Sequence, residues 1–366
     1  MMAIFIMTTL FFLILSGLTI VSLSKQMITT QLVYHGQAVN AARAGLVDSM
    51  SWFRRQSTQP VALFDPKRDL ALNPPINDTD DEAIGIVRDY EISELGSVWG
   101  RFEVRKTRAR DASAERGKPG TGAVWQIDSI GIVYVRKDAN SAFDQYPNYP
   151  LVSATARTEI QRLNLVLPGN AAICAARGDG VDTEAPTRIL GGTDMGILYP
   201  AATGAPTVGG AVAGNPSTGT VDPYLDSIES VFGVSQRELI SMADVVAMSV
   251  NDLPPEFPAM SLAIVKSDAT FDASHPLVGN GILVVLGDTV IESDSFSNFN
   301  GLIYVTGDYE QNSPSQISGA IVVQGDVDIK GGGDFSEVNY DGALLAQIQN
   351  QMSQYRFSRS ALLVQE

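Results

Sequence analysis

The chain has 366 residues, with 41 acidic and 25 basic side chains, and its formal net charge is −16. Because an acidic protein repels phosphate, this balance makes nucleic acid an unlikely main partner. The single cysteine, Cys174, excludes an internal disulfide framework. Only two histidines occur and neither lies near a second metal-type ligand, so we expect no metal and no cofactor. The length indicates two or three structural units.

The N-terminal segment carries the strongest signal. No charged side chain occurs from Met1 to Ser24, and residues 3–23 are almost continuously apolar. About 20 such residues, at about 1.5 Å each, span a hydrocarbon core. The basic start and small-residue cleavage site of a secretory signal are not evident. We therefore expect a retained transmembrane helix.

The same helix is expected to continue past the apolar run. Residues 25–55 contain no proline, and their apolar positions are spaced by three, four and seven residues. This spacing is typical of an amphipathic helix. The sequence predicts one helix over residues 1–57, with a second half that packs against its own domain or a neighbouring subunit.

A linker and a small sheet are expected next. Residues 58–97 are rich in proline, aspartate and asparagine and predict a surface loop. Their acidic run lacks the glycine and the final glutamate of an EF-hand calcium loop. Residues 98–168 contain three stretches that alternate apolar and polar side chains, which predicts antiparallel strands packed on the N-terminal helix.

Basic side chains cluster on the first predicted hairpin. We interpret them as a solvated strand face rather than a DNA contact, because few aromatic side chains are interleaved for stacking. The cluster consists of Arg101, Arg105, Lys106, Arg108, Arg110, Arg116 and Lys118.

Residues 169–345 contain an internal repeat. Three segments align without gaps, and each has a four-residue apolar run followed by Gly-Asp: residues 281–288, 301–308 and 319–326. A period near 20 is typical of a stacked β-solenoid. Weaker copies begin at Ala263, Ala171 and Gly210.

The Gly-Asp pairs are expected to form the corners of this solenoid. Glycine there permits a positive φ, and aspartate can bond nearby backbone groups. A structural role is favoured over a calcium or catalytic role because the spacing differs from calcium-binding repeats and no general acid is evident. We expect no enzyme activity and no catalytic residue. The predicted corner residues are Gly287, Asp288, Gly307, Asp308, Gly325 and Asp326.

Two helical regions accompany the solenoid. An insert over residues 222–248 is predicted, with Gly233 ending a first helix and Ser235 opening a second with a capping box. A C-terminal helix and tail are expected over residues 346–366, and the helix is expected to cap the open end of the stack. The predicted fold class is α+β, mostly β: a transmembrane helix, a pilin-like antiparallel sheet and a C-terminal β-solenoid.

Two segments of the chain resemble the PilX-type minor pilins. One is Ala41-Ala42-Arg43-Ala44-Gly45-Leu46 in the N-terminal helix, and the other is residues 299–305 of the repeat (Phe-Asn-Gly-Leu-Ile-Tyr-Val). The resemblance implies a structural subunit of a type IV pilus or related fibre, at its tip or in assembly initiation and surface contact. It also implies an inner-membrane location before assembly, an extracellular fibre afterwards, and other pilin-like subunits as partners. The implied helix-packing residues are Ala41, Ala42, Ala44, Gly45 and Leu46.

A second hypothesis stays open. The chain would then be a single-pass, membrane-anchored envelope protein whose β-solenoid binds a cell-envelope polymer or a partner protein. We favour the fibre subunit, and a prepilin leader upstream together with recovery in sheared appendages would distinguish it from the anchored protein.

Overall fold

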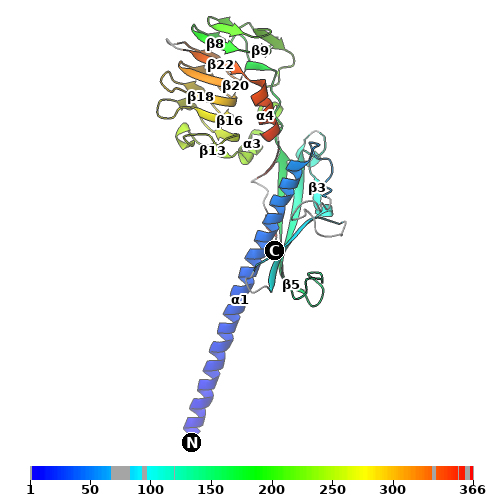
Figure 1. Cartoon of the computed structure of the whole chain (residues 1–366). Helices are drawn as coiled ribbons and strands as arrows, with labels where there is room; N and C mark the ends of the chain where they lie inside the picture. Colours follow the sequence, from blue (N-terminus) through cyan, green and yellow to red (C-terminus); the bar gives the residue numbers. More distant parts are fainter. Residues whose placement is uncertain are drawn as a thin grey trace. The chain divides into compact units, whose positions relative to one another are not determined.

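The computed structural model describes residues 2–66, 83–92, 97–118, 120–331, 335–352, 354–358 and 363–365. The side chains of residues 2–24, 26, 27 and 363–365 lie outside this description. The chain divides into two compact units (Figure 1). Unit 1 comprises Met1–Gln161 and Phe357–Glu366, and unit 2 comprises Arg162–Arg356.

The N-terminal element is a single long helix, α1, over Met2–Arg55 (Figure 1). At about 1.5 Å per residue its 54 residues extend about 80 Å. The predicted transmembrane helix is corrected: within the part of the chain that is described, no helix is both long and apolar enough to cross a membrane. The apolar side chains of residues 3–23, on which that prediction rested, lie outside the described residues.

Unit 1 combines α1 with an antiparallel sheet of strand order β1-β2-β4-β5. The predicted strands are confirmed as β2, β4 and β5, and β4 pairs with β5 along its whole length. One difference concerns the predicted linker 58–97, because β1 lies within it and pairs with β2. Its acidic run, residues 77–82, lies outside the described residues. The elements are β1 (Ile84–Glu91), β2 (Val98–Arg105), η1 (Lys106–Arg108), β3 (Ala109–Asp111), η2 (Ala114–Arg116), β4 (Val124–Val135), β5 (Tyr149–Arg162) and β24 (Leu363–Gln365).

Small residues let α1 lie close against this sheet. A Cβ added to Gly131 in β4 would lie 1.9 Å from the carbonyl oxygen of Ala38, so only glycine fits beneath the helix there. Further along α1, the Phe53 ring packs 5.2 Å from Trp125 and 5.4 Å from Phe64, measured between ring centroids. Since a small sheet is not stable alone, this buried helix face is part of the core of unit 1.

Unit 2 is a β-solenoid, as the repeat predicted. The long strands β14, β16, β18 and β20 pair in parallel, and Gly281, Gly301 and Gly319 occupy equivalent positions in the register. The short strands β15, β17, β19 and β21 form a second parallel sheet. These strands are β14 (Ser261–Val265), β15 (Ala269–Phe271), β16 (Val278–Val285), β17 (Thr289–Ile291), β18 (Asn298–Val305), β19 (Tyr309–Gln311), β20 (Ser315–Val323) and β21 (Val327–Ile329).

The stack continues through strands from the start of unit 2. Beyond β20 the next coil is composite, because the first half of β20 pairs with β22 and the second half with β6. The pair Ile321 and Ile173 joins segments that lie far apart in the sequence. The remaining strands of the stack are β6 (Ala171–Ala175), β7 (Val181–Thr183), β8 (Thr187–Leu190), β9 (Met195–Pro200), β10 (Thr207–Val208), β11 (Ala211–Ala213), β12 (Thr218–Val221), β13 (Val245–Ala247) and β22 (Ser336–Tyr340). The short strand β23 (Tyr355–Phe357) belongs instead to the antiparallel sheet, next to β5.

The long strands are apolar on both faces because both are buried. Ile303 and Val305 of β18 point into the solenoid core, while Leu302 and Tyr304 belong to a second cluster formed with the helices. Tyr304 packs 5.3 Å from the ring of Phe232, and its hydroxyl donates to the Asp226 carbonyl at 2.7 Å. The helices are α2 (Ile228–Phe232), α3 (Gln236–Met242) and α4 (Gly342–Met352), with the 3-10 turn η3 at Val250–Asp252.

The helical predictions are confirmed in part. Gly233 ends α2, and Ser235 opens α3 with the predicted capping box, but α2 begins after Ser227 rather than at Asp222. The predicted end cap is wrong. α4 packs through Leu345, Ile348 and Met352 on the outer face of the long-strand sheet, so it covers a side of the stack.

Candidate functional site

The exposed side of α1 carries several aliphatic side chains together with polar ones. Leu32, Val33 and Val47 are 67%, 52% and 51% exposed. Gly36 and Ala44, two small exposed residues, lie between them in sequence. Leu32 and Val33 lie about 21 Å from Val47 along the helix, and Asn40 and Arg43 are exposed between them. This face has the shape and chemistry for packing against another helix, since small residues allow close approach.

The residues predicted for helix packing lie mostly on the opposite face. Ala41, Ala42, Gly45 and Leu46 are buried within unit 1, and Ala44 alone of the five is exposed. A Cβ on Gly45 would lie 2.2 Å from the hydroxyl oxygen of Ser129 in β4. These small residues therefore allow α1 to pack closely against the sheet of its own unit. The sequence pattern could not separate the two faces, because Leu32 belongs to the same heptad-like series as Leu46.

A hollow of about 440 Å³ lies beside the exposed helix face within unit 1. Ile28, Leu32 and His35 of α1 line one side, and Leu151 and Val152 of β5 line the other. Ile28 and Leu151 are themselves exposed. The apolar surface thus continues from the helix onto the first residues of β5, which widens the area that a partner could cover.

The basic cluster of unit 1 is largely neutralised by ion pairs. Arg101 contacts Asp89 at 2.7 Å and the buried carboxylate of Glu103 at 2.8 Å. Arg105 contacts the same glutamate at 3.1 Å. The remaining ion-paired members are Lys106 with Asp65, Arg110 with Glu115, and Arg116 with Glu159. These pairs balance the charge of the cluster, while Arg101 and Glu103 are largely buried rather than solvated.

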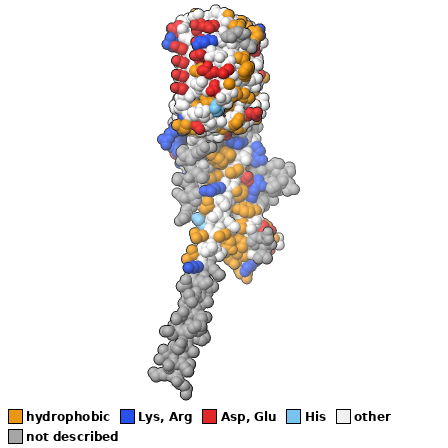
Figure 2. Space-filling model, turned by 90° about the vertical axis from the view of Figure 1, so that its left-hand side faces the viewer, with side chains coloured by type: hydrophobic (Ala, Val, Ile, Leu, Met, Phe, Trp, Pro, Cys, Tyr) orange, Lys and Arg blue, Asp and Glu red, His pale blue; other side chains and the backbone are white. Residues whose placement is uncertain are grey.

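The corner aspartates of unit 2 form a hydrogen-bonded ladder. Asp288 Oδ1 accepts the backbone N–H of Asp308 at 2.9 Å, and Asp308 Oδ1 accepts that of Asp326 at 2.8 Å. Asp268 starts the ladder, and its Oδ1 accepts the N–H of Asp288 at 3.0 Å. Figure 2 shows acidic side chains stacked in columns on unit 2. The ladder links the corners of successive coils, and a structural role for these residues stays a prediction.

Glycine is needed at the corners because a side chain would not fit there, and not because of the backbone conformation. The positive φ values of the repeat lie at Gly281, Gly301 and Gly319 instead. A Cβ on Gly307 would lie 2.1 Å from Asp288 Oδ1 and 2.8 Å from the Gly287 backbone. The predicted positive φ at the corners is therefore wrong, and the physical reason for glycine is the close stacking of successive coils.

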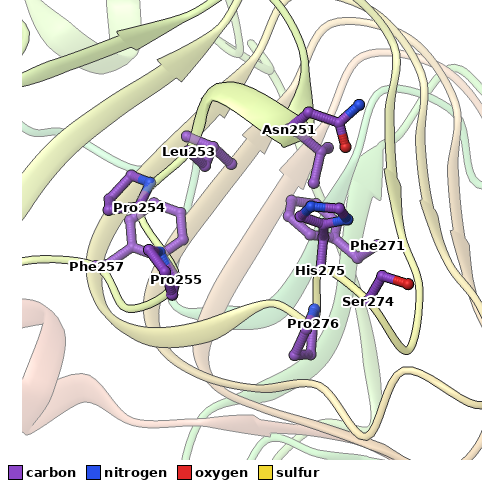
Figure 3. A pocket seen from close by; sticks show the side chains of 10 residues that line it. Asn251, Leu253, Pro254, Pro255, Phe257, Phe271, Ser274, His275 and Pro276 are labelled. Carbon is purple, nitrogen blue, oxygen red and sulfur yellow. The ribbon is translucent and has the colours of Figure 1, made fainter.

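A cavity of about 500 Å³ opens where η3 meets the turn after β15 (Figure 3). Its walls are mainly apolar, from Leu253, Pro254, Phe257 and Phe271, and His275 is the titratable side chain that lines it. Hydrogen bonds from the backbone N–H groups of His275 and Ser274 lower the pKa of nearby Asp272. His275 Nδ1 lies 3.7 Å from Asp272 Oδ1, and no other titratable side chain is among the residues that line this cavity.

The described residues contain no group of three or more His, Cys, Asp or Glu side chains arranged to hold a metal ion. The exposed face of α1 is accordingly the best-defined candidate site. Comparison of the chain with protein-family models, with curated proteins and with solved structures found no match.

Proposed function

We propose that this chain is a structural subunit of an extracellular fibre, similar to the PilX-type minor pilins, and that α1 packs among the helices of neighbouring subunits. The observation that carries the proposal is the division of α1 into two faces. One face is buried against the sheet of unit 1, and the other exposes Leu32, Val33 and Val47. A long helix gains most of its stability from tertiary packing, so a partner helix is the natural cover for the second face.

Under this proposal the two units have different roles in the fibre. Unit 1 has a long helix seated on an antiparallel sheet, which supports a role in assembly. Unit 2 is a separate compact solenoid, and its bulk favours a tip or initiating position over a repeating position in the fibre wall. Under this proposal, unit 2 meets the surface or molecule that the fibre contacts.

Fractionation of sheared appendages tests the proposal. In cells that normally make the protein, Leu32→Asp should remove the chain from the sheared fraction, because a carboxylate would be buried unpaired in the helix contact. Asn140→Asp introduces the same charge in an exposed loop of unit 1 and should leave fibre incorporation unchanged. Incorporation of the Leu32→Asp chain at the parental level, or absence of the parent chain from the sheared fraction, would overturn the proposal.

A further inference from the structure

A second apolar feature lies on the turns that lead into the long strands of unit 2. Asn298, Gln316, Glu337 and Arg188 occupy one register position in successive coils. Phe296, Pro314 and Phe335 each lie two residues before a member of this row. The three apolar side chains line a shallow hollow of about 310 Å³ together with Asn298, Gln316 and Glu337. An apolar row and a polar row therefore run side by side across three coils.

Phe296 is presented to solvent by a strained turn. Its side chain is 73% exposed, and its φ is 51°. A bulky residue at positive φ is a genuine outlier, and such strain persists where the surrounding structure enforces it. The neighbouring Ser297 is buried, and its hydroxyl accepts the Leu277 N–H at 2.9 Å and lies 3.0 Å from that of Ser295. These contacts fix the turn and hold the phenyl ring outward.

Phe335 offers a second ring on the same side. It is 43% exposed, and the guanidinium of Arg188 lies 3.7 Å from its centroid. Stacking of this kind orients the ring. Since neighbouring coils are about 4.8 Å apart, the two phenylalanines lie two coils, or about 10 Å, from one another along the stack. The rings therefore mark two positions along the hollow rather than one compact spot.

The polar row supplies hydrogen-bonding groups beside the rings. Gln316 Nε2 donates to Glu337 Oε1 at 3.4 Å, and Arg188 lies 4.0 Å from the other oxygen of Glu337. The side chain of Asn298 is exposed next to them. Amide, carboxylate and guanidinium groups together provide both donors and acceptors in nearly fixed planes.

We propose that this hollow binds an extended, neutral glycan, with pyranose rings stacked on Phe296 and Phe335 and hydroxyls bound by Asn298, Gln316 and Glu337. A pyranose presents an apolar C–H face and a rim of hydroxyls, which matches one apolar row beside one polar row. The net charge of −16 and the acidic columns of unit 2 disfavour an anionic polymer. A peptide added as a strand is disfavoured because β18 and β20 are already paired on both edges. This inference does not depend on the fibre proposal.

Calorimetric titration of the full chain with three soluble hexasaccharides tests it: cellohexaose, chitohexaose and mannohexaose. At least one should bind, and Phe296→Ala should weaken that binding about tenfold or more, because a stacked phenyl face is lost. Phe296→Tyr keeps the ring and should keep the affinity. Leu225→Ala removes an exposed apolar side chain outside the hollow and should leave binding unchanged. Gln316→Ala, which leaves the strained turn untouched, should also weaken binding.

Three outcomes would overturn the inference. They are the absence of binding to all three hexasaccharides, equal affinity in the parent, Phe296→Ala and Gln316→Ala chains, and self-association of the chain that is lost in Phe296→Ala. The last outcome, measured by sedimentation velocity, would identify the hollow as a contact between copies of the chain.

Discussion

Asp308 links three successive coils: its N–H donates to Asp288 Oδ1 at 2.9 Å, and its own Oδ1 accepts the N–H of Asp326 at 2.8 Å. Asp308 therefore donates to one neighbouring coil through its backbone N–H and accepts from the other through its side chain. Carboxylates stacked at this spacing repel one another, and the hydrogen bonds between successive coils offset this repulsion. This arrangement predicts different effects for removal of the acceptor and removal of the charge.

Replacement of Asp308 separates these two effects. Asp308→Ala removes the acceptor for the Asp326 N–H and should lower the free energy of unfolding by ~1 kcal/mol. Asp308→Asn keeps an acceptor oxygen and removes one negative charge from the column, so it should match or exceed the parent in stability. Urea unfolding of the two variants measures the difference. Equal destabilisation by alanine and asparagine would show that the charge, rather than the acceptor, is what the corner requires.

Two glycines of α1 should respond oppositely to alanine. At Gly45 an added Cβ would lie 2.2 Å from Ser129 Oγ and 2.9 Å from Phe102 Cδ2, so Gly45→Ala should destabilise unit 1 by about 1–3 kcal/mol. At Gly36 nothing lies within 4 Å, so Gly36→Ala should stabilise the helix by roughly 0.5–1 kcal/mol. Thermal unfolding of both variants provides the measurement. A stable Gly45→Ala chain would contradict the close seating of α1 on β4.

Cys174 should not react with thiol reagents in the folded chain. Burial raises the pKa of its thiol to about 12, and the side chain lies within the helix-covered cluster of unit 2. A thiol reagent at pH 8 should therefore label it only after unfolding. Rapid labelling of the native chain would place Cys174 at an accessible surface instead.

The same thiol makes stability depend on alkaline pH. Because its pKa is raised in the folded state, the contribution of the neutral thiol is fully present below the unfolded pKa and is lost as the pH rises toward 12. Between pH 8.5 and 10, the stability of the parent relative to Cys174→Ala should fall by about 1.5 kcal/mol. A stability difference between the two chains that stays constant over that pH range would contradict the burial of the thiol.

Local repeats made the solenoid predictable. The Gly-Asp pairs and apolar runs set the register of β16, β18 and β20, and Gly281, Gly301 and Gly319 pair as their alignment implied. The composite coil was not predictable in the same way. The sequence marked Ala171, where β6 begins, as a weaker copy of the repeat. It gave no sign that β6 and β22, which lie at opposite ends of unit 2, together form one coil.

The candidate sites were harder to predict because they depend on whether a side chain is buried in its own unit or exposed on the surface. An apolar helix stripe indicates burial, but it does not say whether the cover is the chain's own sheet or another molecule, as Leu46 and Leu32 illustrate. Phe296 and Phe335 lie outside the three aligned repeat segments, so the repeat did not single them out. Their exposure depends on the turn at Phe296, and a positive φ at a phenylalanine has no sequence signal.

The most direct test of the fibre proposal is site-specific photo-cross-linking from position 32 of α1. A benzoylphenylalanine in place of Leu32, introduced in cells that make the protein, should yield a covalent adduct to the N-terminal helix of another fibre subunit, identified by mass spectrometry. The same probe in place of Asn140 should not yield this adduct. Adducts confined to the chain's own residues, or equal capture from both positions, would contradict the assembly role of α1.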